Sequence, residues 1–214
     1  MEVRLLSRKE VESLQIPVTE VMDVVEKGFT LKGKDALEMP AKIGIHPRKD
    51  CFIHAMPCFV GGGADVAGIK WVSGYPLNQA KGLPYITGVM CLNDPETGFV
   101  KVIMDANWIT AWRTGAATGV CARHMADPDS RVLAVIGLGV QGRTNAAALA
   151  AALPKVEKVK VYDNHAEQVP RFIELVKEDL KGIEILPCAT VEETVREADV
   201  VVTCTPIVND PERF

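Results

Sequence analysis

The chain has 214 residues, 48% of them apolar, and a formal net charge of −4. This length suits one large domain or two small ones, and the apolar fraction argues against a disordered chain. It has no block of lysine and arginine that would follow a nucleic-acid backbone, and no run of about 18 apolar residues that would span a membrane. The first residues lack the apolar segment of a secretory signal. The sequence therefore predicts a cytoplasmic protein whose partners are neither nucleic acid nor membrane.

The spacing of cysteine and histidine bears on metals. The six cysteines stand singly, without a Cys-x-x-Cys pair, and the four histidines show no spacing that would hold zinc. We therefore expect free thiols and no bound metal.

The first forty residues have the pattern of helices. Ser7 and Glu10 form a capping-box pair, and Thr19 stands where a second helix would be capped. Apolar residues then recur at helical spacing, namely Val21, Val24, Val25 and Phe29.

From residue 41 to 106, short β-rich runs are separated by proline and glycine, which predicts strands. These runs are Lys42–His46, Cys51–Val60, Val66–Val72, Ile86–Asn93 and Phe99–Met104. Asp94–Gly98 has the composition of a hairpin loop. A helix rich in small residues is predicted from about Thr110 to Ala126, and the polar stretch 127–130 ends it. We expect the domain boundary there, with an α+β domain over 1–128 and a second domain over 129–214.

Beyond residue 130, strands alternate with helices, which predicts a parallel, doubly wound α/β sheet with right-handed crossovers. The predicted strands are Val132–Ile136, Val159–Tyr162, Ile183–Pro187 and Val200–Thr203, and the helices are about Gly142–Leu153, Ala166–Leu180 and Val191–Glu197. A complete dinucleotide-binding fold usually has six strands. We therefore expect a Rossmann domain that is incomplete at its C-terminal end.

The first of these strands leads into Gly137-x-Gly139-x-x-Gly142. In a strand-to-helix turn, the first glycine allows the tight turn, the second lets the backbone approach a pyrophosphate, and the third lets the helix pack on the strand. Asp163 ends the second strand, where an acidic residue binds the ribose hydroxyls of NAD. No arginine follows it to accept a 2′-phosphate, so NAD is favoured over NADP. The alternative is a simple turn formed by Asp163 and Asn164.

Further cofactor contacts are predicted from position alone. Residues inside the glycine turn and at the carboxyl end of the fourth strand would face the ligand crevice of an open α/β sheet. The complete set of cofactor candidates is Gly137, Gly139, Val140, Gln141, Gly142, Asp163, Thr203 and Thr205.

Four motifs occur in an order that resembles the ornithine cyclodeaminase/mu-crystallin family. They are Ile69–Pro76, Leu92–Gly98, Thr110–Ala117 and Ile136–Gly142, and the resemblance extends from about residue 39 to 206. It implies a homodimer of two-domain subunits, in which the α+β domain binds substrate and forms the dimer contact and the Rossmann domain binds NAD(P).

The resemblance also implies basic groups that grip the substrate carboxylate. Carried over motif by motif, these are Lys70 and Arg113, with Lys42 standing where relatives commonly have an arginine. Arginine can bind a carboxylate through two parallel hydrogen bonds, whereas lysine offers a point charge. The alternatives are a solvent-facing lysine at 70 and an internal ion pair at Arg113.

The implied activity is an NAD-dependent reaction at the α-carbon of an amino acid, such as conversion of L-ornithine to L-proline and ammonia, which combines oxidoreductase and lyase chemistry. Alternatives within the family are a cyclic imine (pyrroline-2-carboxylate) reductase and an L-amino-acid dehydrogenase. Alternatives of another class are a mu-crystallin-like protein that binds NAD(P) and a small ligand, and an inactive fragment.

The family's proton-transferring aspartate follows a later strand of the Rossmann domain. Neither Asp199 nor Asp210 matches that motif, and Asp199 precedes its strand, at the wrong end of the sheet. We therefore expect the 214 residues to be a fragment or a shortened gene product.

Overall fold

The computed structural model describes residues 2–206, which divide into two compact units. Unit 1 comprises residues 2–15 and 27–110, and unit 2 comprises 16–26 and 111–206. This division differs from the boundary expected after residue 128: it falls inside the helix α3 (Asn107–Met125). It also assigns the first turns of α2 (Val18–Gly33) to unit 2, because Met22 packs there with Ala116 and Val120 of α3.

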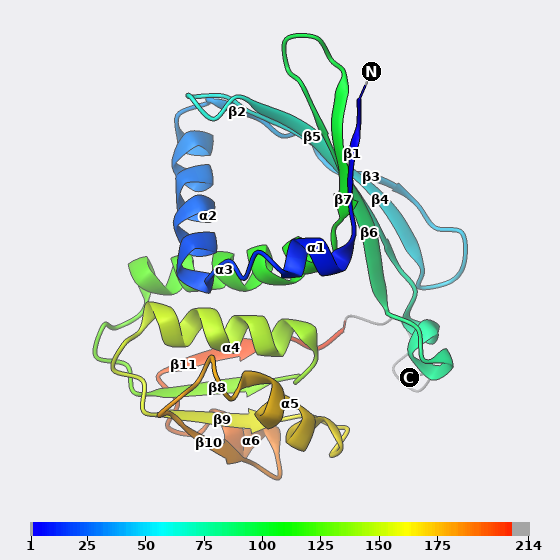
Figure 1. Cartoon of the computed structure of the whole chain (residues 1–214). Helices are drawn as coiled ribbons and strands as arrows, with labels where there is room; N and C mark the ends of the chain where they lie inside the picture. The colour runs from blue at the N-terminus through cyan, green and yellow to red at the C-terminus, as the bar shows by residue number, and fades with distance from the viewer. Residues whose placement is uncertain (1, 207–214) are drawn as a thin grey trace. The chain divides into compact units, whose positions relative to one another are not determined.

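Unit 1 contains one seven-stranded sheet in the order β1-β7-β6-β5-β4-β2, with β3 also paired to β4 (Figure 1). The pairing is antiparallel except between β1 and β7. The strands are β1 (Arg4–Leu6), β2 (Leu37–Glu38), β3 (Ile43–Ile45), β4 (Phe52–Val60), β5 (Val66–Gly74), β6 (Ile86–Asn93) and β7 (Val100–Asp105). The short helices are α1 (Arg8–Glu12) and the 3-10 helix η1 (Pro76–Lys81).

The helical prediction for the first forty residues was only partly right. The Ser7–Glu10 capping box is present, but residues 4–6 and 37–38 form strands, because the sheet edges at β7 and β4 supply their hydrogen-bond partners. The predicted cap at Thr19 is wrong, since α2 already begins at Val18. Val24 and Phe29 are exposed, and the fully buried residue of α2 is Met22.

The hairpin predicted at Asp94–Gly98 is confirmed, because this segment joins the antiparallel strands β6 and β7. Asp94 organises the loop by accepting hydrogen bonds from the backbone N–H groups of Glu96 and Thr97, each at 3.0 Å.

Unit 2 contains a four-stranded parallel sheet in the order β10-β9-β8-β11, which confirms the predicted doubly wound α/β fold. Its strands are β8 (Val132–Ile136), β9 (Lys158–Tyr162), β10 (Glu184–Pro187) and β11 (Val200–Thr203), and its helices beyond α3 are α4 (Val140–Ala152), α5 (Gln168–Val176) and α6 (Val191–Val195). Helix α4 begins two residues earlier than predicted, with Gly139 as its N-cap.

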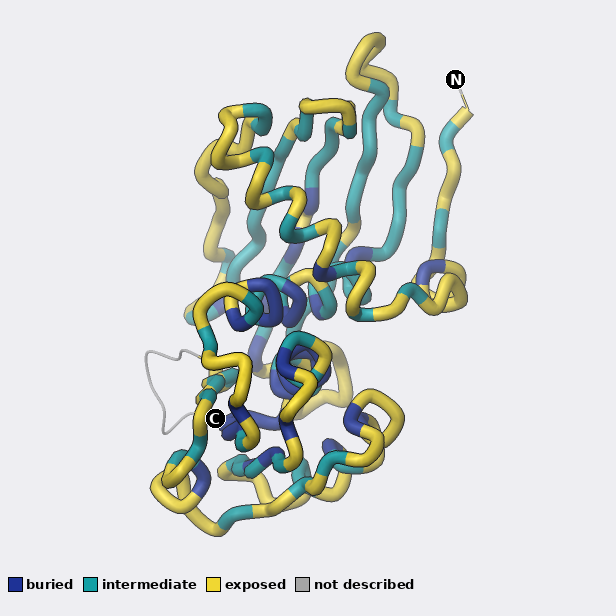
Figure 2. Tube along the Cα trace, turned by 90° about the vertical axis from the view of Figure 1, so that its left-hand side faces the viewer, coloured by how far each residue is buried: buried dark blue, intermediate teal, exposed yellow. Residues whose placement is uncertain are grey.

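The best-packed core lies in unit 2, where buried segments are concentrated in Figure 2. Leu133, Val135, Val159 and Val161 of the central strands are fully buried, together with Phe172 of α5. Central strands of a parallel sheet are covered by helices on both faces, and accordingly every side chain of β8 is apolar. This rigid centre holds the turn between β8 and α4.

Candidate functional site

The turn from β8 to α4 has the backbone conformation that its glycines predict. Gly137 has φ +90°, a region that residues with a side chain rarely adopt, and its N–H donates to the carbonyl oxygen of Tyr162 at 2.9 Å. The turn is thereby fixed to the end of β9, where Asp163 follows.

The surroundings of the three glycines differ as their predicted roles require. A Cβ at Gly142 would lie 2.1 Å from the carbonyl oxygen of Gly137, so only glycine lets α4 approach the strand this closely. A Cβ at Gly137 would lie 2.8 Å from the backbone carbonyl carbon of Cys204. At Gly139, in contrast, a Cβ would meet nothing within 4 Å, and this glycine is exposed. The turn is therefore crowded by protein at two glycines and open at the second, which is where a pyrophosphate would approach.

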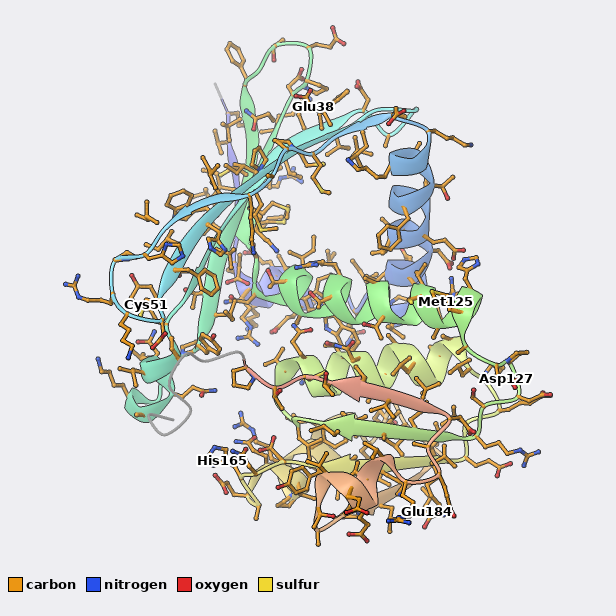
Figure 3. The ribbon with its side chains drawn as sticks, turned by 180° about the vertical axis from the view of Figure 1, so that it is seen from behind. Glu38, Cys51, Met125, Asp127, His165 and Glu184 are labelled. Carbon is orange, nitrogen blue, oxygen red and sulfur yellow. The ribbon has the colours of Figure 1, made fainter. Side chains whose placement is uncertain are left out.

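Asp163 is tied directly to the glycine turn. One carboxylate oxygen accepts a hydrogen bond from the Leu138 N–H at 2.7 Å, and the other accepts one from the His165 N–H at 2.9 Å. His165, two positions beyond Asp163, is labelled in Figure 3, where it lies on the opposite side of unit 2 from Glu184 at the start of β10. Each oxygen keeps a lone pair that could accept a ribose hydroxyl.

The remaining cofactor candidates surround this turn. Val140 is exposed at the start of α4, and Gln141 lies against Asn145, whose side-chain amide donates to the Gln141 carbonyl oxygen at 2.8 Å. Thr203 and Thr205 are exposed at the carboxyl end of β11, next to the turn because Gly137 packs on the Cys204–Thr205 peptide. Burial raises the pKa of the intervening Cys204 thiol to about 11.

The residues present fit a dinucleotide. An open glycine at a helix N-terminus leaves room for a pyrophosphate, and a carboxylate one strand away suits a ribose. The cofactor candidates are spread over 69 positions of the sequence, from Gly137 to Thr205. In the folded chain they lie close together within unit 2.

Lys70 and Lys42 line the same pocket of unit 1. Lys70, on β5, is only 8% exposed. The pocket has a volume of about 360 Å³ and is lined by residues 39–42, by residues 56–58 of β4 and by Lys70. Two of the three predicted carboxylate-binding residues therefore line one cavity.

The sheet register places Lys70 between two methionines. Lys70 pairs with Met56 on one side and Met90 on the other, and Met90 pairs in turn with Met104 of β7. Directly opposed residues share a face of a sheet, so this row of four side chains lies on one face. The sequence analysis did not identify these methionines. Met56 could have been found by asking which residues of the neighbouring predicted strand lie on the same face of the sheet as Lys70.

Arg113 lies on α3 in unit 2, outside the face that packs on α4. That face contains Gly115, where a Cβ would lie 2.3 Å from the carbonyl oxygen of Thr144. Arg113 itself is an exposed residue, yet desolvation lowers the pKa of its guanidinium. Among residues 2–206, no carboxylate forms an ion pair with it.

Asp199 has a structural task at the amino end of the sheet. Its carboxylate accepts hydrogen bonds from the backbone N–H groups of Arg131 and Val132 at 2.7 and 2.9 Å, and these bonds lower its pKa. This agrees with its exclusion as the proton-transferring aspartate. Asp210 lies outside the described residues.

No helix within residues 2–206 has the length and apolar character needed to cross a bilayer. The same residues contain no group of three or more His, Cys, Asp or Glu side chains that could hold a metal ion.

The parallel sheet of unit 2, with a glycine turn after its first strand and an acidic residue after its second, defines a dinucleotide-binding protein of the Rossmann class. More narrowly, the chain belongs to the ornithine cyclodeaminase/mu-crystallin family, whose sequence pattern matches residues 1–210. The resemblance inferred from the four motifs is thereby confirmed.

Known relatives cover nearly all of this chain. Nodulation efficiency protein NfeD of Rhizobium meliloti is 39% identical over 203 residues, which are 95% of this chain and 62% of that protein. The Delta(1)-pyrroline-2-carboxylate reductase of Thermococcus litoralis, solved with NADH and L-proline, matches with a TM-score of 0.90 at 35% identity over 95% of this chain and 62% of its own. An archaeal alanine dehydrogenase dimer with bound NAD matches with a TM-score of 0.86 at 38% identity, over 96% and 61%. The chain thus spans about three fifths of the length of these relatives.

Proposed function

We propose that this chain binds NAD and a small amino or cyclic imino acid, and that the protein catalyses hydride transfer at the α-carbon of that substrate. The observation that carries the proposal is the open glycine turn at Gly139, linked to the Asp163 carboxylate by the Leu138 N–H. The solved relatives with NADH and L-proline, and with NAD, support the same assignment.

Each part of the chain would have a separate task. NAD, when bound, supplies the acceptor or donor of hydride. Asp163 would bind the ribose, and the glycine turn would hold the pyrophosphate against the N-terminus of α4. Lys70 and Lys42 would bind the substrate carboxylate, with Arg113 as a third anchor whose planar group suits two parallel hydrogen bonds. Fixing the carboxylate orients the α-carbon for transfer.

We further propose that the subunit pairs with a second copy through the sheet of unit 1. On the face opposite to Lys70, the directly paired residues Ile43, Ala55, Trp71 and Val89 form an apolar row. Ile43, Trp71 and Val89 are 71%, 47% and 41% exposed. An apolar row of this kind favours an interface, and the solved alanine dehydrogenase relative is a dimer.

The test is turnover by the whole protein. Purified protein is mixed with NAD and L-alanine or L-ornithine, and with NADH and 1-pyrroline-2-carboxylate. NADH absorbance and ammonia release are followed together, because a cyclodeaminase returns its hydride and changes only ammonia. Activity with at least one substrate is expected. Normal NAD binding without any turnover would instead support a binding protein, and loss of both would support an inactive fragment.

A further inference from the structure

A histidine stands beside the two lysines of the unit 1 pocket. Lys70 pairs directly with Met56. Continuing the β3–β4 register by one residue places Lys42 opposite Met56 on its other side, and all three residues line the pocket. Lys42, Met56 and Lys70 thus form a row across the sheet, which we call the lysine row. His54 precedes Met56 by two residues on β4, so it lies on the same face of the sheet, one row beyond the pocket.

The His54 ring is held in place by its neighbours. It stacks on the Phe52 ring, with centroids 4.2 Å apart and planes inclined by 19°. Gly44 pairs with His54 on β3, and a Cβ at this position would overlap the imidazole. A Cβ at Gly74 would likewise overlap the Phe52 ring. Two glycines therefore provide bare backbone on which the pair of rings rests, and the imidazole is fixed beside the lysine row.

The strands that flank His54 present basic groups to it. Lys42 and His46 stand at the two ends of β3, and the His46 ring meets the His54 ring edge-on with centroids 6.2 Å apart. On β5 the diagonal neighbour of His54 is Lys70, two residues from its directly paired partner. Diagonal neighbours in a sheet are about 7–8 Å apart, a distance over which charges in a partly desolvated site still interact.

The carboxylate nearest to His54 in the sequence belongs to Asp50, which precedes β4. Burial raises the pKa of Tyr85, and the charge of Asp50 adds to that effect, so this carboxylate acts on the tyrosine. For His54, burial first, and then the charges of Lys42 and His46, lower the pKa below its ordinary value of 6.5. The His54 ring is therefore largely neutral at pH 7.5 and able to accept a proton.

A carboxylate held by the lysine row would change this balance. A negative charge near an imidazole favours its protonated form, so the pKa of His54 would rise when the anion binds. The effect is reciprocal, because a ligand that promotes protonation must itself bind more tightly to the protonated site.

We propose that His54 is a positioning residue of the carboxylate site: an anion on the lysine row draws a proton from solvent onto the imidazole, and the protonated ring strengthens the hold of the site on that anion. No bond of the substrate changes in this step. The inference rests on the proposed function, in which Lys42 and Lys70 bind the substrate carboxylate, and it adds that substrate binding is linked to the uptake of a proton.

Calorimetry of L-proline and L-alanine binding to the whole protein saturated with NADH tests the inference. Both amino acids and NADH are reduced, so no hydride is transferred, and neither amino acid changes its charge between pH 5.5 and pH 7.5. At least one of them is expected to bind about fivefold more tightly at pH 5.5 than at pH 7.5. Titrations at pH 6.5 in two buffers of different ionisation enthalpy should show a net uptake of protons.

Three variants separate His54 from other titrating groups. In His54→Gln, the gain in affinity at low pH and the proton uptake should both be lost. His54→Arg is always charged and should bind the ligand at pH 7.5 about as tightly as the unaltered protein does at pH 5.5. His46→Gln is the matched control: the register places His46 opposite Phe52, two rows from the lysine row, so most of the pH dependence should remain.

Thermal melting verifies that the variants fold. Affinity that does not change with pH in the unaltered protein would overturn the inference, and so would an unchanged pH dependence in folded His54→Gln or an equal loss in His46→Gln. If neither amino acid binds at any pH while NADH binds normally, the proposed function itself fails. The two failures are therefore distinguishable.

Discussion

At the scale of single residues, glycine has different consequences at positions that look alike in the sequence. Gly137 and Gly142 are surrounded by backbone atoms, whereas Gly139 adjoins open space. The motif predicts all three, yet only the tertiary structure separates the glycines that are crowded by backbone from the one that adjoins open space. Substitution at each position should therefore affect a different property.

Gly139→Val should abolish NAD binding and leave the melting temperature nearly unchanged. The new side chain would occupy the space that a pyrophosphate needs, while its Cβ contacts no protein atom within 4 Å. Affinity is measured by calorimetry. Gly33→Val serves as the control, because a Cβ at Gly33 also meets nothing within 4 Å. Gly33 lies at the end of α2, far from Gly139 in the sequence. Unchanged NAD affinity in Gly139→Val would refute the assignment of the turn.

Asp163→Asn should weaken the preference for NAD over NADP by about tenfold or more. The substitution keeps an oxygen that can accept the Leu138 N–H but removes the negative charge that would repel a 2′-phosphate. Dissociation constants for both cofactors are compared with those of the unaltered protein. A preference that does not change would indicate that Asp163 serves only the turn.

At the scale of elements, contact between α3 and α4 depends on small residues. Gly115 meets the backbone of Thr144, and Gly119 lies beside Met22 and Ala148, so side chains at these positions would force the helices apart. The sequence indicated a helix rich in small residues without showing which positions touch another helix.

Gly115→Ala should destabilise the protein by about 1–3 kcal/mol, the usual cost of overpacking. Its Cβ would lie 2.3 Å from the Thr144 carbonyl oxygen, and a backbone atom cannot move aside cheaply. Urea denaturation measures the change. Thr118→Ala, on the same helix and only partly buried, is the control. Equal stability of both variants would contradict the packing seen here.

Within unit 2, charged side chains also link α2 to the C-terminal end of α3. Glu26 contacts His124 at 2.6 Å and Arg123 at 2.9 Å, and Arg123 also contacts Asp23 at 2.8 Å. The hydrogen bond from His124, and then that from Arg123, lower the pKa of Glu26 below its ordinary value of 4.5.

A lowered pKa in the folded state means that ionised Glu26 stabilises the fold above pH 4.5, and that this contribution is lost as the pH falls through the folded-state pKa. The melting temperature of the unaltered protein should exceed that of Glu26→Gln at pH 7, and the difference should shrink as the pH falls below 4.5. Because the Glu26 side chain is partly exposed to solvent, the difference should be small and should decrease with added salt. A difference in melting temperature that does not change with pH would show that it does not arise from the ionisation of Glu26.

At the scale of the whole molecule, the two faces of the unit 1 sheet have separate proposed tasks. Strand alternation places Lys70 on one face and Trp71 on the other, although they are neighbours in the sequence. One face would receive substrate and the other a second subunit.

Trp71→Glu should therefore shift a dimer toward monomer without loss of the NAD site in unit 2. A charge at the centre of an apolar interface is costly unless it is paired. Sedimentation velocity gives the oligomeric state and calorimetry the NAD affinity. Val24→Glu, which also replaces an exposed apolar residue but on α2, is the control. A Trp71→Glu variant that stays as dimeric as the control would argue for another interface.

Sequence patterns alone were enough to predict the parallel α/β class of unit 2, the position of the glycine turn, and the acidic residue after the second strand. These follow from local patterns, because apolar runs and glycine spacing act within a few residues. The sequence did not reveal that residues 4–6 and 37–38 are strands, since such short segments take their hydrogen bonds from distant partners.

The residues that flank Lys70 in the sheet, and the glycines that contact backbone, could be identified only from the folded chain. Met56, Lys70 and Met90 come from three strands, and their meeting depends on the register of a sheet. Gly115 and Thr144 meet because two helices cross at small residues. Register and helix packing are set by the burial of many side chains at once, which no local pattern encodes.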